Sequence, residues 1–393
     1  MLVEFQYPVF SPPLGGIENY ILEAGAAFEE LGHQWQVFSG PKLDPKVELD
    51  EQSKIALWRH PLTRPKGLSL LWRPIAEYRT LCQYQKGIKR PQADLVIARH
   101  PIYAISAKVA LGTKSHIVYL PGVDMTRRAR SETIGSPRWR DRLFGRLFTP
   151  QWARLERRAI GSANTFMVLS KNMQNQMSSH SSRLALVNGA GVNLSKFSAN
   201  KETREKLRQE LGIKENEVLI VTAARLSPEK NVAFGLQLLA KLEKHVKYLV
   251  LGTGDLRSSL EKLAQELSIT ERVTFTGLVP NPQDYYAASD LYLQPATEEP
   301  FGHVLLEAMA SELPVAATAN KGGKYRVATE ELVPPDCGVH IDVDDPAKVC
   351  RELEGLLSSA DERQQVGQRA RKHIKQHHSW TKHVTMIIDQ KSR

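Results

Sequence analysis

The sequence has few cysteines and no long apolar run. Its three cysteines, Cys82, Cys337 and Cys350, match no metal-ligand spacing. Scattered thiols in an odd number form no disulfide framework, so we expect a reducing compartment. No apolar stretch approaches the roughly 18 residues that a membrane-spanning helix needs. Met1–Phe5 also lacks the basic start and long apolar core of a secretory signal peptide. We therefore expect a cytoplasmic protein, or one on the inner face of the cytoplasmic membrane.

Low-complexity tracts and internal repeats are also absent. The composition, with 41% apolar and 24% charged residues, is that of a globular protein. A chain of 393 residues is long enough for two domains of ordinary size, each with its own core.

Positive charge is concentrated in the first half of the chain. The net charge is +10, and Met125–Ile160 holds ten arginines against three acids. Such a field attracts phosphate-rich partners. Aromatic residues alternate with the arginines of Arg127–Arg158 at helical spacing, which fits a helix on an anionic membrane surface. A helix packed on its own domain, with solvated arginines, fits equally well. Nucleic acid is disfavoured, because no recognition module accompanies the charge.

The order of predicted elements is that of an α/β protein. Leu2–Gln6 reads as a strand, and Gly15-Gly16 opens a helix that ends near Leu31. A strand, a glycine loop and a helix begin many nucleotide-binding units, and Gly16 lets the backbone approach a bound group. Further strands are predicted at residues 34–38, 55–58, 94–98, 116–120, 164–169, 184–187, 218–223, 247–251, 273–277, 290–293, 314–318 and 338–342.

Two strand ends in this pattern carry basic residues. His100 follows the buried strand 94–98, where α/β folds place ligands, so it is a candidate on the acceptor side. A helix-capping or surface role for His100 is an equal alternative. Arg225 and Lys230 follow the strand 218–223 and enter one loop. Two fixed cations there would stabilise a diphosphate leaving group as it gains charge.

The stretch 294–310 places carboxylates beside a helix start. Pro300 and Gly302 break the extended path, and a helix former resumes at His303. The first amides of such a helix form an anion site. Glu299 lies just outside this helix and Glu307 inside it, so one site offers amides for phosphate and carboxylates for hydroxyls. This combination suits a nucleotide sugar.

These residues also carry a resemblance to a family. Glu299-x7-Glu307 within EEPFGHVLLEAMA, followed by Pro314-Val315, resembles the signature of the retaining glycosyltransferases of family 4, or glycosyl transferases group 1. The resemblance implies the GT-B fold, in which two Rossmann-like parallel-sheet domains face each other across a cleft. It places an acceptor-side domain at 1–197, a nucleotide-sugar domain at 198–379, and a helix at 380–393 that crosses back to the first domain.

The resemblance also implies roles for individual residues. Arg225 and Lys230 would bind the diphosphate, Glu299 the sugar hydroxyls and Glu307 the ribose. The nucleobase would lie near Val279. The implied donor-binding residues are Gly16, Val279, Phe301, Gly302, His303, Val304, Leu305 and Glu307. No metal and no other cofactor is expected, since Asp342-Val343-Asp344 lies late in the chain, in a predicted loop.

The sequence departs from the family in two places. Ala190-Gly191 interrupts a segment similar to the family's Asn-Gly-Val-Asp linker, and the turn Leu120-Pro121-Gly122 lacks the histidine that some relatives have there. The predicted function is retaining transfer of a hexose from a nucleotide diphosphate sugar to a lipid-linked or cell-envelope glycan. A UDP-sugar is the favoured donor and GDP-mannose is next. A GT-B epimerase and a non-catalytic binding protein are the alternatives.

Overall fold

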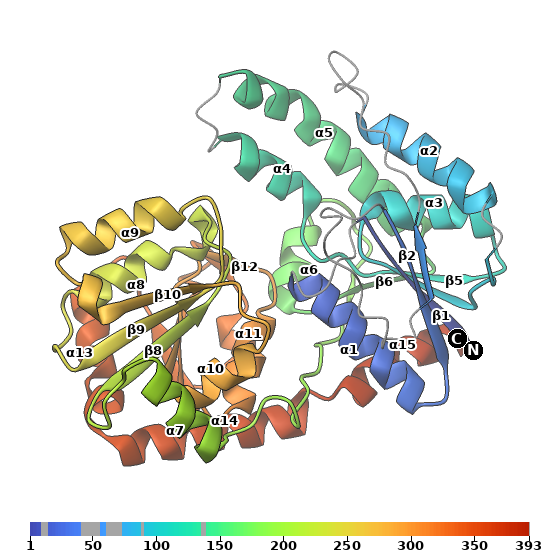
Figure 1. Ribbon diagram of the computed structural model, residues 1–393. Helices are drawn as coiled ribbons and strands as arrows, with labels where there is room; N and C mark the ends of the chain where they lie inside the picture. Colours follow the sequence, from blue (N-terminus) through green and yellow to red (C-terminus); the bar gives the residue numbers. More distant parts are fainter. Residues whose placement is uncertain (9–14, 41–55, 60–72, 88–89, 135–138, 393) are drawn as a thin grey trace. The chain divides into compact units, whose positions relative to one another are not determined.

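The computed structural model describes residues 1–8, 15–40, 56–59, 73–87, 90–134 and 139–392, with the backbone alone at 59, 73–77, 80, 84, 131–134 and 139–148. The chain folds as two compact units (Figure 1). Unit 1 comprises Met1–Ala190 and Trp380–Arg393, and unit 2 comprises Gly191–Ser379.

The division after Ala190 differs from the predicted boundary after Phe197. The Phe197 ring lies 6.0 Å from the ring of Tyr286, and the Phe197 carbonyl accepts a hydrogen bond from Arg371 at 2.8 Å. Both partners belong to unit 2, so the segment after Ala190 packs with that unit.

Unit 1 is built on a parallel sheet with the strand order β3-β2-β1-β4-β5-β6-β7. All four residues of β4 are fully buried, as expected for a strand covered on both faces. The strands are β1 (Leu2–Tyr7), β2 (Gln34–Ser39), β3 (Ala56–Arg59), β4 (Leu95–Ala98), β5 (His116–Tyr119), β6 (Thr165–Val168) and β7 (Leu186–Val187). The helices are α1 (Gly16–Glu30), α2 (Arg73–Gly87), α3 (Pro101–Leu111), α4 (Met125–Ile134), α5 (Trp139–Ser162), α6 (Lys171–Met177) and α15 (Trp380–Ser392).

The last helix, α15, packs on α1 within unit 1. His383 of α15 is buried and lies 2.7 Å from the hydroxyl of Tyr20 in α1. Its second ring nitrogen, Nδ1, lies 3.1 Å from the carbonyl of Gly189. Since a carbonyl only accepts, Nδ1 carries the proton and Nε2 accepts from Tyr20. Residues at the two ends of the chain are therefore joined in one core.

Unit 2 has a six-stranded parallel sheet with the order β10-β9-β8-β11-β13-β15 and a small sheet of β12 and β14. The strands are β8 (Val218–Ala223), β9 (Val246–Leu251), β10 (Val273–Gly277), β11 (Leu291–Gln294), β12 (Glu298–Glu299), β13 (Val315–Thr318), β14 (Arg326–Val327) and β15 (Gly338–Ile341). The helices are α7 (Lys201–Glu210), α8 (Val232–Leu239), α9 (Arg257–Glu266), α10 (Pro282–Ala288), α11 (His303–Ala310), α12 (Thr329–Leu332), α13 (Pro346–Ser358) and α14 (Ala360–His377), with 3-10 turns η2 (Pro228–Lys230) and η3 (Thr270–Arg272).

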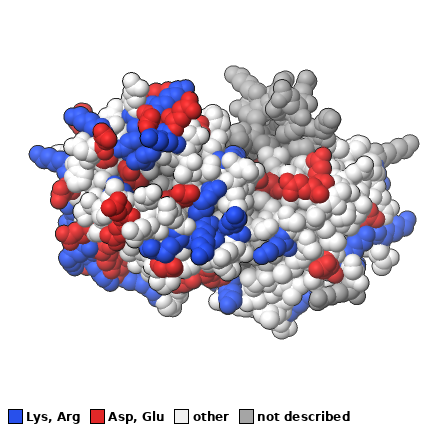
Figure 2. All heavy atoms as spheres, turned by 90° about the horizontal axis from the view of Figure 1, so that it is seen from below, with Lys and Arg blue, Asp and Glu red and all other residues white. Residues whose placement is uncertain are grey.

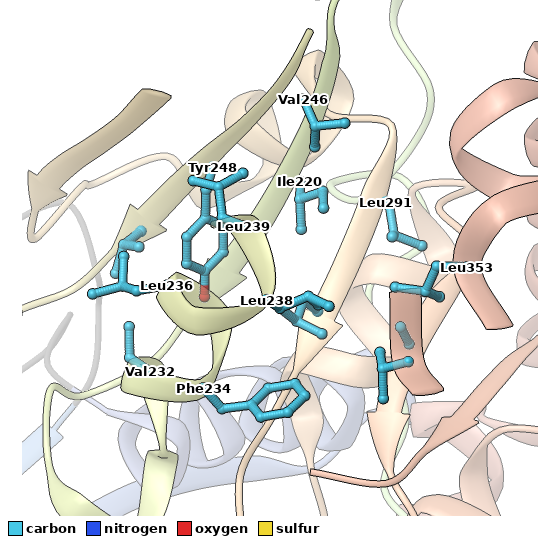
Figure 3. Close-up of a cluster of buried hydrophobic side chains, with 14 of the residues drawn as sticks. Ile220, Val232, Phe234, Leu236, Leu238, Leu239, Val246, Tyr248, Leu291 and Leu353 are labelled. Carbon is cyan, nitrogen blue, oxygen red and sulfur yellow. The ribbon is translucent and has the colours of Figure 1, made fainter. Parts of the chain in front are cut away.

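The core of unit 2 lies between α8, α13 and the sheet (Figure 3). Tyr248 of β9 extends toward α8, where a Cβ at position 235 would lie 2.4 Å from its hydroxyl oxygen. Glycine at this position therefore makes room for Tyr248, although it weakens a helix by about 1 kcal/mol relative to alanine. The buried hydroxyl of Tyr248 donates to Thr222 Oγ1 at 2.7 Å, so it is not left unpaired.

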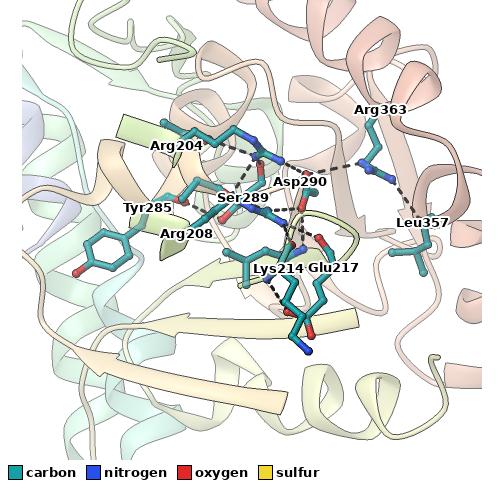
Figure 4. Close-up of polar contacts among 12 residues, drawn as sticks. Arg204, Arg208, Lys214, Glu217, Tyr285, Ser289, Asp290, Leu357 and Arg363 are labelled. Atoms are coloured by element: carbon teal, nitrogen blue, oxygen red, sulfur yellow. Dashed lines mark hydrogen bonds and ion pairs between the residues drawn. The ribbon is translucent and has the colours of Figure 1, made fainter. Parts of the chain in front are cut away.

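A buried carboxylate connects α7 to the start of β11 (Figure 4). Asp290 accepts from Arg204 at 2.6 Å and from Arg208 at 2.9 Å, and the amide of Leu219 in β8 donates to it at 2.8 Å. Burial raises the pKa of Asp290, but the Arg204 charge, the Leu219 amide and Arg208 outweigh burial, and the pKa is lowered. This cluster fixes α7 against the strands that carry the candidate site.

The outer helices of unit 2 have the mixed charge of a solvated surface. On the face seen in Figure 2, acidic and basic side chains are interspersed over this unit. Exposed pairs such as Lys201–Glu205 in α7 contribute little to stability. Among the described residues, no helix combines the length and apolar character that crossing a bilayer requires.

The basic segment Arg127–Arg158 forms α4 and α5. Trp152 and Leu155 of α5 pack against the core of unit 1, while Arg154 and Arg157 are exposed. The C-terminal half of α5 thus uses its apolar side for packing. The aromatic side chains predicted to face a membrane, at residues 139–148, lie outside the described side chains.

Candidate functional site

The strand order of unit 2 reverses between β8 and β11, which are neighbours in the sheet. In open parallel sheets, ligands bind beyond the carboxyl ends of the strands at such a switch point. The loop after β8 carries Arg225 and Lys230, and the segment after β11 carries Glu299. The predicted catalytic residues therefore lie where the topology favours a ligand.

Lys230 and Glu299 are in direct contact. Lys230 Nζ lies 2.6 Å from Glu299 Oε2, and each side chain is less than one-fifth exposed. Gln294, the last residue of β11, donates from Nε2 to the same carboxylate oxygen at 3.3 Å. These contacts hold a cation and a carboxylate at fixed positions beside the switch point.

Arg225 lies on the same loop but forms a different pair. Its Nη2 donates to Glu229 Oε1 at 2.9 Å, and the Arg225 side chain is 61% exposed. The Glu229 carbonyl in turn accepts from the amide of Thr297, so the loop after β8 is joined to the segment before Glu299. The structure therefore brings Lys230 and Glu299 together, whereas Arg225 reaches solvent and is held by Glu229.

The helix α11 begins at His303, as predicted. Its N-cap residue, Gly302, has φ +100°, a conformation that favours glycine, and its end has no side-chain cap. A Cβ at position 302 would lie 3.4 Å from Glu299 Cγ, so the helix start adjoins this glutamate. The neighbouring predicted residues are buried (Phe301, Leu305) or half-buried (His303, Val304).

Glu307 lies one turn into α11 and contacts the hydroxyl of Tyr286 at 3.2 Å. Tyr286 is fully buried, and both its burial and the Glu307 charge raise the pKa of this tyrosine. Its hydroxyl is therefore a donor that orients the Glu307 carboxylate.

Three polar neighbours of the site are absent from the sequence prediction. They are Glu229, Gln294 and Tyr286. The i,i+4 spacing of Arg225 and Glu229 was a usable signal. Nothing in the local sequence pairs Gln294 or Tyr286 with the site glutamates. Gln294 reaches Glu299 through the path of the chain from β11 to β12, and Tyr286 reaches Glu307 through the packing of α10 and α11.

The glycines after β9 serve packing rather than dinucleotide binding. Gly252 has φ +125°, and a Cβ there would lie 2.0 Å from the Ala224 carbonyl oxygen. The Gly252 amide donates to the Gly277 carbonyl at 2.8 Å, which joins the loops after β9 and β10. Val279, the residue predicted near a nucleobase, follows this junction and is half-buried.

The predicted residues of unit 1 lie at its own switch point, between β1 and β4. Gly16 is the exposed first residue of α1. His100 is 9% exposed and packs edge-to-face on Trp152 of α5. Burial, with a smaller effect of Arg128, lowers the pKa of His100 to about 3, so this imidazole is neutral near pH 7. The ring therefore serves α5 packing, and its acceptor contact stays a prediction.

Asp342 and Asp344 are paired with lysines. Lys321 binds both carboxylates, and Lys324 and Tyr325 bind Asp344. Among the described residues no group of three His, Cys, Asp or Glu side chains is arranged to hold a metal ion. The expected absence of a metal cofactor stays a prediction.

Comparison with known proteins agrees with this geometry. Residues 203–373 match the family described as Glycosyl transferases group 1, and residues 15–186 match the Glycosyl transferase 4-like domain. Together these matches extend over most of the chain. The chain belongs to the group 1 glycosyl transferases. The predicted family is thus confirmed.

Individual relatives show the same relationship. The chain is 29% identical over 196 residues to the uncharacterized glycosyltransferase MJ1607 of Methanocaldococcus jannaschii, covering 48% of this chain and 49% of the relative. It is 36% identical over 138 residues to alpha-monoglucosyldiacylglycerol synthase of Streptococcus pneumoniae, covering 33% and 31%. The chain thus spans about half the length of the curated relatives it matches, or less.

A solved structure shows the fold along the whole chain. Alr3699/HepE of Anabaena, in complex with UDP and glucose, has a TM-score of 0.78 and 19% identity, with 99% of each chain covered. The predicted GT-B fold, with two parallel-sheet α/β domains, is confirmed.

Proposed function

We propose that this protein transfers a hexose from a nucleotide diphosphate sugar to a hydroxyl group of an acceptor, with retention of configuration. The observation that carries the proposal is the contact of Lys230 Nζ with Glu299 Oε2 at 2.6 Å, at the β8–β11 switch point. A cation for the diphosphate and a carboxylate for sugar hydroxyls then lie side by side, next to the start of α11.

Each charged group has one task in this proposal. Lys230 and Arg225 neutralise the diphosphate, together with the amides of residues 302–305 at the start of α11. Glu299 accepts hydrogen bonds from the sugar, and Glu307, oriented by Tyr286, accepts them from the ribose. Orienting a bound substrate in this way supplies several kcal/mol of barrier reduction.

The chemical step needs no covalent enzyme intermediate. The bond between the sugar C1 and the diphosphate oxygen breaks, and that oxygen keeps the electron pair. The acceptor hydroxyl attacks C1 from the same face and gives its proton to the departing phosphate oxygen. Fixed cations stabilise the charge that develops on this oxygen, and such electrostatic stabilisation is often the main source of rate enhancement in enzymes. Two protein cations take this role, so we propose a metal-independent reaction.

A UDP-sugar is the proposed donor, with GDP-mannose next. Alr3699/HepE, which has the same fold, was solved with UDP and glucose. The proposed acceptor is a lipid-linked or cell-envelope glycan, since one relative is named as a synthase of monoglucosyldiacylglycerol. Exposed arginines of Arg127–Arg158 would hold the protein at an anionic membrane surface on the cytoplasmic side.

Assays of donor turnover test the proposal. Purified protein is incubated with UDP-glucose, UDP-N-acetylglucosamine or GDP-mannose, with and without a lipid extract, and release of free nucleotide is measured. NMR of the product determines the anomeric configuration. Retention with nucleotide release is expected. Affinity without turnover would indicate a binding protein, and conversion of the donor into a nucleotide sugar of altered configuration without any acceptor would indicate an epimerase.

A further inference from the structure

Lys230 has two binding partners that compete for it in the proposed reaction. In the structure its Nζ contacts Glu299 Oε2 at 2.6 Å, whereas the reaction needs the same cation on the donor diphosphate. A diphosphate carries more negative charge than one carboxylate, so it attracts Lys230 more strongly. Glu299 then loses part of its ion pair when it must hold the sugar hydroxyls. A second contact is needed to keep this carboxylate in place.

Gln294 provides that second contact. Its Nε2 donates to Glu299 Oε2, the oxygen that Lys230 also contacts, at 3.3 Å. This hydrogen bond is longer than the ion pair and therefore weaker while Lys230 is in place. The Gln294 side chain has no charge, so a diphosphate does not draw it away. The contact between Gln294 and Glu299 is thus the one that persists when the donor binds.

The orientation of the Gln294 amide is fixed by its two neighbours. A carboxylate only accepts hydrogen bonds, so the amide nitrogen faces Glu299 and the amide oxygen faces the other way. There, Gln294 Oε1 accepts from the hydroxyl of Tyr292 at 3.0 Å. A flipped amide would place its oxygen against the carboxylate and lose that hydrogen bond. The network therefore selects one of the two amide orientations.

Tyr292 stays a hydrogen-bond donor over a wide pH range. Its side chain is fully buried, and burial, opposed by the contact with the Ala223 carbonyl, raises the pKa of Tyr292 well above its usual value. The charges of Glu307 and Glu299 raise this pKa further. The hydroxyl therefore keeps its proton at neutral pH and donates it to Gln294.

The backbone that carries Gln294 is held from both sides. Thr318 Oγ1 of β13 donates to the Gln294 carbonyl at 3.2 Å. Thr222 Oγ1 of β8 donates to the carbonyl of Leu293, the preceding residue, at 2.6 Å. Gln294 is 3% exposed, and a buried amide destabilises a fold unless it is hydrogen-bonded, as it is here. Such support is typical of a residue that orients a functional group.

We propose that Gln294 is a positioning residue, which keeps the Glu299 carboxylate directed at the donor sugar after the diphosphate has taken Lys230. Tyr292 in turn orients Gln294. This inference rests on the proposed function, because it explains how one glutamate of the site is held during the same reaction. In this proposal neither Gln294 nor Tyr292 touches the donor, and both act through Glu299.

Two readouts on the full chain test the proposal, one of binding and one of turnover. Calorimetry compares the affinities of UDP-glucose, UDP-N-acetylglucosamine and GDP-mannose with those of UDP and GDP. Initial rates of nucleotide release give kcat and KM for the donor that reacts fastest. Gln294→Leu removes the hydrogen bond to a charged group, so kcat should fall by about 10- to 100-fold. Its affinity for the free nucleotide should stay within about twofold of the wild type, since no cation of the diphosphate site is changed.

The effect should disappear when Glu299 has already been changed. In the Glu299→Gln background, Gln294→Leu should lower kcat by less than about threefold further, because a residue that acts through Glu299 has no carboxylate left to position. A purely structural role would give the same loss in both backgrounds. Tyr292→Phe removes only one hydroxyl and should lower kcat by about 3- to 10-fold.

Gln294→Glu should give a distinctive pH profile. The introduced carboxyl repels Glu299 when it is ionised and donates to it when it is protonated. The kcat of this variant relative to the wild type should therefore rise by about threefold or more from pH 8 to pH 6. Should Gln294→Leu fail to fold, this profile and the kcat of Tyr292→Phe decide the assignment.

Thr318→Val is the matched control. It removes a buried hydrogen bond to the backbone of Gln294 and leaves the side-chain amide intact. Because both Thr318→Val and Gln294→Leu lose buried hydrogen bonds, the Tm should decrease in each. The kcat of Thr318→Val should nevertheless stay within about threefold of the wild type, since the contact with Glu299 is unchanged.

Two results would overturn the assignment. In the first, Gln294→Leu has the kcat of the wild type. In the second, it lowers kcat equally with and without Glu299. A wild type that turns over no donor would instead refute hexose transfer, and binding would then decide the role of Gln294. That role stands if Gln294→Leu weakens the nucleotide sugar alone, and it is refuted if the free nucleotide is weakened equally.

Discussion

Glu298 and Glu299 are neighbours in β12, yet their carboxylates bond to different cations. Glu298 Oε2 lies 2.6 Å from Arg326 Nη2 of β14, and Glu299 Oε2 lies 2.6 Å from Lys230 Nζ. One carboxylate holds the small sheet together, and the other faces the switch point. These two adjacent glutamates therefore have different roles, since Glu298 is structural and Glu299 belongs to the candidate site.

Glu299→Gln should therefore lower donor turnover by about 100-fold or more, because it removes a charge aligned with the reacting sugar. Glu298→Gln, the matched control, should change turnover by less than about threefold. Initial rates of nucleotide release with the preferred donor measure both. Equal rates for the two variants would remove Glu299 from the mechanism.

Asp290→Asn should destabilise the protein by about 3–5 kcal/mol, because it leaves Arg204 and Arg208 without their shared carboxylate. The folded pKa of Asp290 is lowered, so its stabilisation is present above the unfolded pKa and is lost as the pH falls through the folded value. As the pH falls below about 4, the free energy of unfolding should therefore decrease less in this variant than in the wild type. Urea titrations of unit 2 unfolding measure this, with Glu205→Gln expected to change stability by less than about 0.5 kcal/mol.

Glu156 should make stability fall as the pH rises. It accepts from Tyr119 at 2.5 Å and from the Met125 amide at 3.1 Å. Burial, opposed by the Tyr119 hydrogen bond, raises its pKa from 4.5 to about 7. The stabilisation is full below pH 4.5 and disappears as the pH passes 7, a change of roughly 3 kcal/mol from this group.

The free energy of unfolding of Glu156→Gln should depend less on pH over this range than that of the wild type. Burial lowers the pKa of His180, but its hydrogen bond to Asp124 outweighs burial, and the pKa is raised. His180 therefore also makes stability fall as the pH rises, so the variant should keep a smaller dependence of stability on pH. Free energies of unfolding at pH 5 and pH 8 measure the difference. A wild type that is equally stable at both values would show that Glu156 is ionised throughout.

Gly252→Ala should destabilise unit 2 by more than about 2 kcal/mol, since its Cβ would overlap the Ala224 carbonyl and its φ is +125°. Gly161→Ala is the contrasting change. A Cβ there meets nothing within 4 Å inside α5, so alanine should be neutral or stabilising by up to about 1 kcal/mol. Thermal unfolding of both variants compares them. Similar Tm values would mean that the loop after β9 can move aside.

Most of the fold was predictable from local sequence. Strands such as 95–98 and 218–223 are continuous apolar runs bounded by polar residues, and buried parallel strands have that pattern. The helix start at Gly302 was predictable because proline and glycine mark it. The helix α3 was not predicted, because residues 101–107 are buried on every side and show no amphipathic period.

Most residues of the candidate site were predictable from the sequence, but the contacts between them were not. Lys230 and Glu299 are far apart in the chain, and only the neighbouring positions of β8 and β11 bring them together. The two-residue strands β12 and β14 are too short to give a periodic signal.

The bond between Tyr20 and His383 has a consequence for biosynthesis. During translation, the first helix leaves the ribosome long before the last one exists, so unit 1 emerges with the α15-binding face of α1 uncovered. Unit 2, whose residues are contiguous, can complete its own core first. Maturation of the N-terminal unit therefore waits for the final helix, and a nascent chain stalled before Trp380 would expose the apolar surface that chaperones recognise.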